Sequence, residues 1–364
     1  MLQFFPSRTL TWYLAKLFVG RIVAVLLMLV LVLQALDLLS ESGKILGVAG
    51  NDQSDLWHYA SLRIPQLVAR FLPYSVLLAT IITLATLNQN SEVIAMKASG
   101  MSAHQVLAPL LMTAALVSAI SFVFNERVVT RSTAALKAWQ AVEYKAIPKD
   151  PATRTNVYFR DGTNILAAGA VSGSGAATVM ENVTWYRRDA NGMVVEQLRS
   201  PRATFAGPGW TLVSPVRFDV ASTVRTELPT RVVAKDVTPA QVAITKVDPD
   251  AQDAITLYRS IQAMKAAGRR TSELEGKWWH KFSGPLSALL MPLLGAIAAF
   301  GLARSGQLLI RAVLGMALGF AYFVVDNAAL AMGNFGAYPP LIAAWAPFVL
   351  FALIGETVLV RTEE

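Results

Sequence analysis

Histidine and cysteine, which often supply nucleophiles, proton carriers and metal ligands, are scarce in this sequence. The chain has three histidines, His58, His104 and His280, and no cysteine. It contains no Gly-x-x-x-x-Gly-Lys-Ser/Thr phosphate loop, no His-Glu-x-x-His and no Gly-x-Ser-x-Gly motif. The histidines lie at the ends of predicted membrane spans, where an interfacial role is expected more often than metal binding. The sequence therefore predicts no catalytic residue, no metal site and no cofactor in this chain.

Four ionisable residues within apolar stretches are the first functional candidates. They are Asp37, Arg63, Arg70 and Asp326, and all fall toward the outer ends of predicted spans. A charge next to hydrocarbon is expensive unless it is paired or faces a cavity, so such residues often mark a substrate path. The two arginines lie seven residues apart on one helix face, and the two aspartates are their candidate partners. The alternative is that the arginines are anchors that reach the membrane surface.

A second candidate is one face of a predicted span near the C-terminus. Gly315 and Gly319 form a G-x-x-x-G pattern, and Tyr322 and Asp326 continue the same face. Small residues four apart allow another helix to approach closely. The pattern predicts a packed or cavity-lining face, and ordinary close packing of helices is the alternative.

The composition indicates the class of protein in which these residues are placed. Of 364 residues, 54% are hydrophobic and only 15% are charged, and the mean hydropathy is +0.46. These values exclude an ordinary soluble globular protein and indicate a polytopic membrane protein. The formal net charge of +8 favours anionic lipid over nucleic acid, because no Lys/Arg run is interleaved with aromatic residues.

Six apolar stretches are long enough to cross a bilayer. They are residues 22–39, 62–87, 106–123, 282–300, 308–331 and 341–360. The first loop holds one basic residue, Lys44, against three acidic residues, whereas Arg304 and Arg311 lie in or beside residues 302–307. Because cytoplasmic loops are enriched in lysine and arginine, both termini are predicted to be cytoplasmic and the segment after the third span to lie outside. The first span is predicted to be retained rather than cleaved as a signal peptide.

Residues 91–100 form a polar segment between the second and third spans. Ser91 is predicted to cap a short helix and Gly100 to end it in a left-handed conformation. Ser102 and Gln105 have the spacing of a capping box for the next span. One face of the short helix carries apolar residues four and then three apart, Ile94, Ala98 and Met101. Such a helix suits docking to a cytoplasmic partner, and the alternative is an ordinary interhelical turn.

From about residue 126 the pattern changes to short alternating runs separated by turn residues. Examples are the turns Asp161-Gly162 and Asn191-Gly192 and the run that begins at Trp210. Evenly spaced short strands of this kind predict a β-sandwich or jelly roll. The domains are therefore predicted as residues 1–127 with three spans, 128–252 as an inserted β-domain, and 253–364 with a connecting helix and three spans.

The connection back to the membrane is predicted as two helices. An amphipathic helix over residues 254–267 ends at Gly268, and Ser272 and Glu275 are predicted to box-cap the next helix. That helix carries Trp278 and Trp279 toward the membrane surface, where tryptophan is enriched.

Several of these stretches together resemble the LptF/LptG permeases of lipopolysaccharide export. The similar motifs are SEVIAMKASG at residues 91–100, VDPDA at 247–251, GPLS at 284–287 and YFVVD at 322–326. The resemblance covers the whole chain and is closer to LptG-type members, through residues 95–100 and Asp326. It implies an α-helical membrane protein with six transmembrane helices and an inserted periplasmic β-jellyroll domain, located in the bacterial inner membrane.

The resemblance also implies partners and roles. The family assembles an LptF-like and an LptG-like permease on an LptB-like ATPase dimer, which binds ATP and Mg, and joins LptC-like and LptA-like bridge proteins. It implies ATPase coupling through Ser91, Glu92, Met96, Lys97 and Gly100. A lateral gate for lipopolysaccharide is implied in the first and fifth spans, at Gln34, Asp37, Gly315, Gly319, Tyr322 and Asp326. The last four are predicted to meet the first span of the partner permease, and a static seam within this chain is the alternative.

The lipid headgroup is expected at cations of the outer rim, which are Lys44, Arg63 and Arg70. Here the sequence departs from the LptG pattern, because Gln34, Ser40 and Glu41 stand where that pattern has lysines. Two other functions remain open at this point. One is a non-transporting subunit that passes ATPase motion to its periplasmic domain, and the other is a membrane enzyme acting on lipid headgroups, for which no residue set is found.

Overall fold

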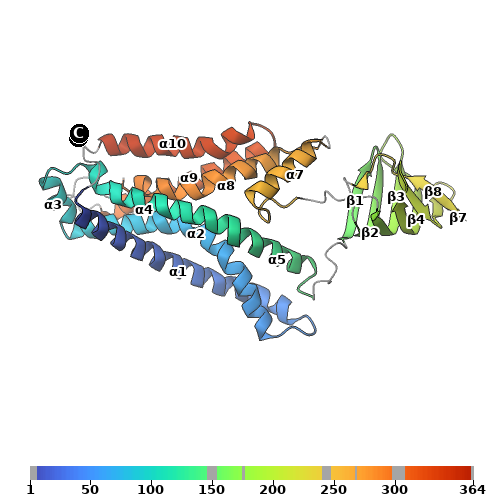
Figure 1. Cartoon of the computed structure of the whole chain (residues 1–364), viewed down its shortest axis with the longest axis horizontal. Coiled ribbons are helices and arrows are strands. Elements are labelled where there is room, and N and C mark those ends of the chain that lie inside the picture. Colours follow the sequence, from blue (N-terminus) through green and yellow to red (C-terminus); the bar gives the residue numbers. More distant parts are fainter. Residues whose placement is uncertain are drawn as a thin grey trace. The chain divides into compact units, whose positions relative to one another are not determined.

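The computed structural model describes residues 6–145, 154–173, 177–239, 247–266, 269–296 and 308–361. The chain divides into two compact units (Figure 1). The helical unit comprises Met1–Ala146 and Asp248–Glu364, and the β-unit comprises Ile147–Val247. The prediction of a helical membrane protein with an inserted β-domain is confirmed.

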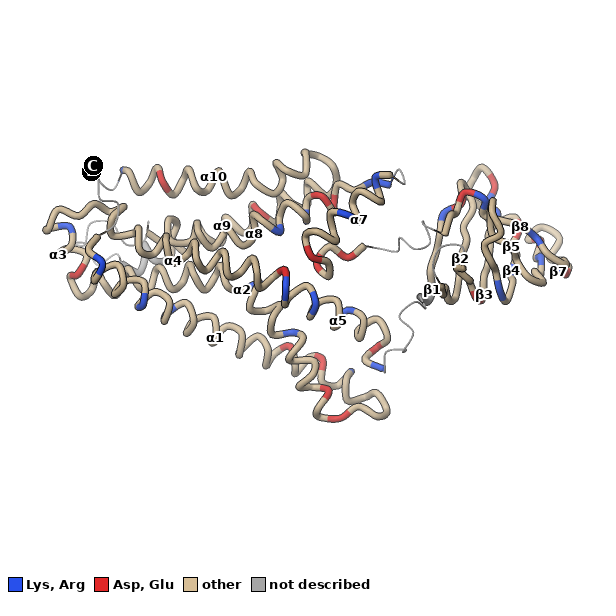
Figure 2. The backbone as a smooth tube through the Cα atoms, viewed as in Figure 1, with Lys and Arg blue, Asp and Glu red and all other residues tan. Residues whose placement is uncertain are grey.

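The helical unit contains long helices and short connecting ones. In chain order they are α1 (Arg8–Leu46), α2 (Gln53–Gln89), α3 (Glu92–Ala98), α4 (Ala103–Phe124), the π-helix η1 (Asn125–Val129), α5 (Thr130–Ala141), α7 (Ala254–Ala266), α8 (Ser272–Ala296), α9 (Leu308–Asn334) and α10 (Pro340–Arg361). In Figure 1, α3 lies at one end of this unit, and α5 and α7 lie toward the other end. Charged residues are found mainly toward these two ends (Figure 2), as expected of helices that cross hydrocarbon.

Among the described residues, five helical stretches are long and apolar enough to cross a membrane. They are Arg8–Leu46, Gln53–Gln89, Ala103–Ala141, Val313–Asn334 and Pro340–Arg361. They correspond to five of the six predicted spans. The other predicted span, residues 282–300, begins inside α8, and its last residues, 297–300, lie outside the described residues. Its described part alone is too short to cross the hydrocarbon core.

The core of the helical unit is formed mainly by helices other than α1. Leu77 and Leu84 of α2 are fully buried together with Leu107 of α4 and Leu294 of α8. By contrast, α1 exposes a long apolar face along most of its length. The exposed large hydrophobic residues in its second half are Leu27, Met28, Leu31, Val32, Leu36, Leu39 and Leu46. This face is suited to contact with lipid or with another membrane helix.

The α3–α4 junction confirms most of the predicted local chemistry. Gly100 has φ +86°, and Ser102 and Gln105 form both bonds of the capping box. The predicted cap at Ser91 is wrong, because Ser91 has φ 61° and its side chain makes no capping hydrogen bond. An N-cap residue normally has an extended backbone, from which its hydroxyl reaches the first free amides of the helix.

The third span does not end near residue 127, as the domain boundaries assumed. The helix continues through η1 and α5 to Ala141. Leu136 and Trp139 of α5 are buried with Tyr59 of α2 and Ile45 of α1. The change of pattern near residue 126 was interpreted as the start of the β-domain, but tertiary packing extends the helix beyond it. The β-unit therefore spans Ile147–Val247 instead of residues 128–252.

The β-unit is built from antiparallel strands. Those described are β1 (Arg154–Asp161), β2 (Asn164–Ser172), β3 (Val179–Arg188), β4 (Val194–Phe205), β5 (Trp210–Val213), β6 (Val216–Asp219), β7 (Arg225–Glu227) and β8 (Thr230–Val233). Their order is β1-β2-β3-β4-β5-β8, and β6 pairs with β4 and β7. The run predicted from Trp210 is split by Pro215, which cannot donate a backbone hydrogen bond. Trp210 is fully buried and donates its Nε1–H to the Val237 carbonyl at 2.7 Å.

Where the chain returns to the helical unit, the start of α7 has a cap that was not predicted, and the start of α8 differs from its predicted cap. Asp253 precedes α7 and accepts from the Thr256 backbone N–H at 3.1 Å, and hydrogen bonding from Thr256 lowers the pKa of Asp253. Ser272 and Glu275 do not form the predicted capping box. Instead, the Thr271 hydroxyl donates to Glu275 Oε1 at 2.5 Å, because α8 begins at Ser272, one residue earlier than the predicted capping box requires.

Candidate functional site

The candidate site is a cavity of about 580 Å³ in the helical unit, formed by α2, α4, η1, α5, α8, α9 and the turn that contains Asp250. Its lining is rich in charge. The cations are Arg63, Arg70, Lys137, Lys277 and Lys281, and the carboxylates are Glu126, Asp250 and Asp326. His280, Tyr74 and Ser287 also line it. The excess of cations makes this cavity attractive to an anionic group.

Arg63 is engaged by this chain itself. Its Nε lies 3.0 Å from Asp37 Oδ2 of α1, and its Nη2 donates to Asp37 Oδ1 at 3.3 Å. Its Nη1 donates to Gln66 at 2.9 Å, and Tyr59 donates to Asp37 Oδ2 at 2.6 Å. The pairing of Arg63 with Asp37, considered above as an alternative to substrate binding, is therefore present. This polar contact joins α1 to α2.

Arg70, two turns further along α2, is arranged differently. Its side chain is exposed, and its guanidinium lies 6.0 Å from the centre of the Phe71 ring. Within the part of the chain that the structure describes, Arg70 forms no ion pair with a carboxylate. Of the three cations predicted for the headgroup, Arg70 is thus the one whose charge no described carboxylate neutralises.

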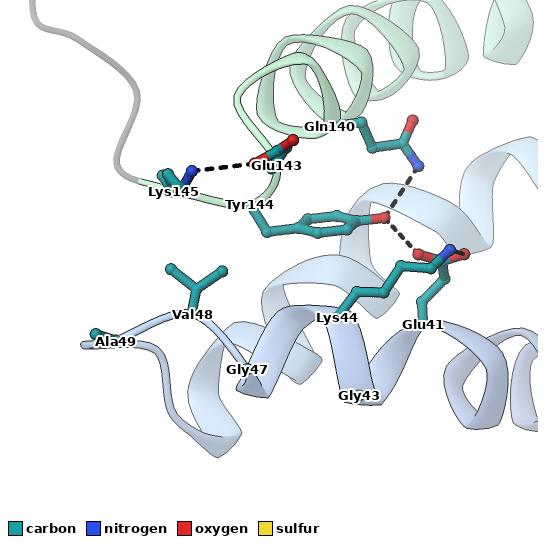
Figure 3. A pocket seen from close by; sticks show the side chains of 10 residues that line it. All are labelled: Glu41, Gly43, Lys44, Gly47, Val48, Ala49, Gln140, Glu143, Tyr144 and Lys145. Carbon is teal, nitrogen blue, oxygen red and sulfur yellow. Dashed lines mark hydrogen bonds and ion pairs between the residues drawn. The ribbon is translucent and has the colours of Figure 1, made fainter.

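Lys44 lies in another place. Its Nζ is 2.8 Å from Glu41 Oε1, and both residues line a separate cavity of about 950 Å³ at the end of α1 (Figure 3). The structure therefore brings Arg63 and Arg70 into one cavity and leaves Lys44 outside it. The positions of these three residues in the sequence did not indicate that Lys44 lies apart from the two arginines.

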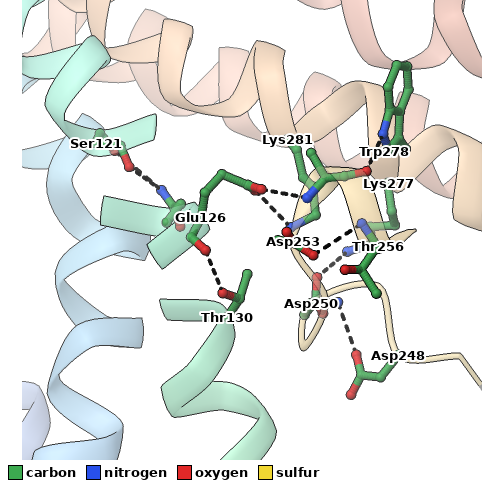
Figure 4. Close-up of polar contacts among 12 residues, drawn as sticks. Ser121, Glu126, Thr130, Asp248, Asp250, Asp253, Thr256, Lys277, Trp278 and Lys281 are labelled. Atoms are coloured by element: carbon green, nitrogen blue, oxygen red, sulfur yellow. Dashed lines mark hydrogen bonds and ion pairs between the residues drawn. The ribbon is translucent and has the colours of Figure 1, made fainter. Parts of the chain in front are cut away.

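Three lysines and one glutamate of the cavity were not predicted. Glu126 of η1 accepts from Lys281 Nζ at 3.2 Å and from the Ala254 backbone N–H at 2.5 Å (Figure 4). Lys277 lies 3.9 Å from Asp250, and Lys137 lies 2.5 Å from Asp248. Lys277 and Lys281 lie four residues apart, beside Trp278 and Trp279, which places them on one helix face. This spacing was the one feature of the sequence that could have indicated these cations. The carboxylates that pair with the lysines lie far from them in the sequence.

The predicted gate face of α9 is turned into this chain. A Cβ atom built on Gly319 would lie 2.2 Å from Leu77 Cδ2 of α2, and Gly315 is also buried. Tyr322 is buried against Phe351 of α10, with ring centres 5.4 Å apart. Asp326 is buried, with Oδ2 3.8 Å from His280 Nε2 of α8. The expectation that this face meets the partner's first span is not met in this conformation, because α2, α8 and α10 already cover it.

The two predicted gate residues of α1 also face the interior. Gln34 is buried, and both atoms of its amide lack a hydrogen-bond partner among the described residues. Asp37, one turn later, is held by Tyr59 and Arg63. The exposed face of α1 is apolar instead, as described above. An unpaired amide buried inside a helical bundle is costly unless water reaches it.

One side of the helix α3 is exposed, and the other side is buried against the helical bundle. Val93 and Met96 are buried in the helical core, whereas Ile94 and Lys97 are exposed. Met96 therefore packs α3 onto the bundle. Glu92 accepts from the Tyr13 hydroxyl of α1 at 3.3 Å and from Asn90 at 3.4 Å. Of the five predicted coupling residues, Ser91, Lys97 and Gly100 are exposed and Glu92 is partly exposed.

These observations define a multi-pass membrane protein of the permease type, with a cation-rich cavity in its helical unit and an inserted β-unit. The sequence of residues 12–361 matches the family described as lipopolysaccharide export system permease LptF/LptG. The chain belongs to this family, and the resemblance stated from its motifs is confirmed.

Two curated relatives extend the comparison. Lipopolysaccharide export system permease protein LptG of Escherichia coli (strain K12) is 24% identical, with 98% of this chain and 99% of that protein aligned. LptG of Haemophilus influenzae (strain Rd) is 22% identical, with 95% and 96% aligned. Both relatives carry the LptG name, in agreement with the LptG-type motifs noted in the sequence.

Proposed function

We propose that this chain is a permease subunit of an ATP-driven transporter that extracts lipopolysaccharide from the inner membrane and passes it to a periplasmic bridge. The observation that carries the proposal is the cation-rich cavity between α2, α8 and α9, together with the family membership. The lipid carries phosphates on a sugar headgroup and several acyl chains. A cavity with cations above an apolar bundle has the chemistry to receive both parts.

Arg70 is the proposed headgroup contact, because its charge is not neutralised by a described carboxylate. Lys277 of α8 is a second proposed headgroup contact, because its amine lies 3.9 Å from Asp250, which is longer than a hydrogen bond. Each such cation contributes about 1 kcal/mol near an anionic membrane surface. We assign Arg63 a structural role, which is to hold α1 through Asp37. Lys44 lies at the end of α1, outside this cavity, and is not assigned to the headgroup.

The proposed ATPase contact is the exposed side of α3. Glu92 stands in the first turn of this helix, where an acidic residue is favoured and can pair with an arginine or lysine of a docked partner. Lys97 and Ile94 lie on accessible positions of the same helix. An LptB-like ATPase dimer is the proposed partner on this side. ATP and Mg belong to that partner, and this chain supplies no catalytic group.

The other proposed partners follow from the exposed surfaces. The apolar face of α1 and the exposed residues of α9, including Phe320 and Val324, are the proposed gate surfaces toward an LptF-like permease. The β-unit is the proposed periplasmic contact with LptC-like and LptA-like bridge proteins. In this orientation the α3 end, both termini and Arg8, Lys16 and Arg21 are cytoplasmic, which agrees with the positive-inside rule.

Photocrosslinking to lipopolysaccharide in the complete complex in nanodiscs tests the proposal. A photoreactive residue at Tyr74 lines the cavity, and one at Trp12, which is exposed on the first turns of α1, is the control. The expected result is an ATP-dependent crosslink at Tyr74 that Arg70→Glu reduces, with no ATP dependence at Trp12. A complex that hydrolyses ATP and exports lipopolysaccharide without any crosslink at Tyr74 would favour the mechanical, non-transporting role for this subunit.

A further inference from the structure

Tyr144 occupies an unusual position at the last described residues before the β-unit. The helix α5 ends at Ala141, and Glu143 and Tyr144 then follow with φ 56° and 62°. Non-glycine residues rarely adopt the left-handed conformation, so two in succession must be held by surrounding contacts. The Tyr144 backbone N–H donates to the Trp139 carbonyl at 3.0 Å, which turns the chain back onto α5.

The side chain of Tyr144 supplies these contacts. Its ring is buried against Trp139 and Tyr59, with ring centres 5.2 Å and 6.2 Å away. Its hydroxyl donates to Glu41 Oε2 of α1 at 2.8 Å and accepts from Gln140 of α5 at 3.3 Å (Figure 3). Burial raises the pKa of the Tyr144 hydroxyl, so the phenol remains the donor to the carboxylate.

The backbone of Tyr144 is fastened as well. Asn51, in the turn between α1 and α2, donates from Nδ2 to the Tyr144 carbonyl at 2.9 Å and to the Ile45 carbonyl at 3.0 Å. One residue thus connects the end of α1, the α1–α2 turn, the start of α2 and the end of α5. We call this set of contacts the Tyr144 clasp, formed by Tyr144, Glu41, Gln140, Asn51 and Tyr59.

The second half of α1 depends on polar contacts of this kind. After Val30, its buried residues are Gln34 and Ile45, and its other inward contacts include Asp37, Glu41 and the partly buried Leu38. Asp37 and Glu41 lie one turn apart on the same face of the helix. The opposite face is exposed and apolar, with Leu39 77% exposed. Polar contacts can be exchanged for water, so this end of α1 can separate from α2 and α5 more readily than a well-packed apolar seam.

We propose that Tyr144 is a positioning residue that holds the end of α1 and must release it before α1 can move as a gate helix. While the clasp is closed, it holds α1 against α2 and α5. Withdrawal of the Tyr144 ring and hydroxyl from the clasp frees the end of α1. This inference rests on the proposed function, because it makes the clasp a control on the gate helix.

A distance measurement tests the clasp without any substrate. The chain has no native cysteine, so spin labels at Leu39 of α1 and Trp57 of α2, each 77% exposed, report only the α1–α2 separation. In the complete complex in nanodiscs, Tyr144→Phe is expected to shift the distances to longer values by several ångströms, and Glu41→Gln to shift them in the same direction. Tyr158→Phe, at an exposed tyrosine of β1, is the matched control and should leave them unchanged. Wild-type distances in both clasp variants would overturn the proposal.

A locking experiment tests whether release is required. Cysteines at positions 41 and 144 are joined by a cleavable bifunctional thiol reagent, in a complex whose partner subunits lack cysteine. The expected result is loss of lipopolysaccharide export with normal ATPase assembly, and recovery when the reagent is cleaved. Export at the rate of the singly substituted, treated complexes would overturn the proposal. Failure of the proposed function would appear separately, as a wild-type complex that transfers no lipopolysaccharide although its α1–α2 distances respond to Tyr144→Phe.

Discussion

Arg63 of α2 and Asp37 of α1 form a two-point ion pair, with Nε to Oδ2 at 3.0 Å and Nη2 to Oδ1 at 3.3 Å. Two bonds of this type fix the relative orientation of the groups as well as their separation. Arg70, on the same helix, has no such partner among the described residues. The two arginines, which looked equivalent in the sequence, are therefore expected to respond differently to substitution.

Arg63→Gln should lower stability and Arg70→Gln should not. Loss of Arg63 leaves Asp37 partly buried with only the Tyr59 hydroxyl, at an expected cost of about 1–3 kcal/mol. Arg70→Gln is expected to change the free energy of unfolding by less than about 0.5 kcal/mol and to weaken lipopolysaccharide crosslinking. Thermal unfolding of the purified complex and crosslinking yield measure the two effects. Equal loss of stability in both variants would contradict the assignment.

Glu92→Lys should impair the complex with the ATPase. The substitution reverses the charge that a basic residue of the partner would meet, and it also removes the Tyr13 contact. Tyr13→Phe removes only that internal hydrogen bond and is the control. We expect reduced co-purification of the ATPase and reduced export for Glu92→Lys, with normal membrane insertion and near-normal values for Tyr13→Phe. If Glu92→Lys assembles and exports like the wild type, the docking role is wrong.

Gly319→Ala should destabilise the protein, whereas Gly20→Ala should not. A Cβ at Gly319 would lie 2.2 Å from Leu77 Cδ2, and one at Gly20 would meet nothing within 4 Å. Overpacking costs about 1–3 kcal/mol, while alanine in place of an exposed helical glycine gains up to about 1 kcal/mol. Combining Gly319→Ala with Leu77→Ala should cost less than the sum of the single changes, as measured by thermal unfolding. Additive costs would argue against a direct Gly319–Leu77 contact.

Glu126→Gln should weaken the junction between η1, α7 and α8. Glu126 and Lys281 are both only 14% exposed, so the lysine loses its anionic partner at a position that is largely shielded from water. The expected cost is about 1–3 kcal/mol, with faster proteolysis near residue 254. Glu143→Gln is the control, because Glu143 is largely exposed and its ion pair among the described residues is with the exposed Lys145; it should cost less than about 1 kcal/mol. Similar proteolysis of both variants would count against the Glu126 junction.

Local sequence patterns determined the elements of this protein. Apolar stretches of span length have no stable place in water, so the membrane helices followed from composition and hydropathy alone. Gly100, Ser102 and Gln105 set the end of one helix and the start of the next through contacts within a few residues. Short alternating runs with glycine turns gave the β-unit. Even so, the cap at Ser91 and the boundary near residue 128 were wrong, because backbone conformation and packing on α2 decided them.

Only the tertiary structure decided which charged and polar side chains meet. Arg63 finds Asp37, Lys281 finds Glu126, and Tyr144 finds Glu41 across long stretches of sequence. It also decided that the Gly319 face turns toward Leu77 instead of a partner. Hydrophobic periodicity specifies that a face is buried, but it carries no information about what covers that face. Pairing of distant charges and the choice of neighbouring helix depend on the three-dimensional packing of all the spans, and that packing is what separated Arg63, a structural contact, from Arg70, the proposed headgroup contact.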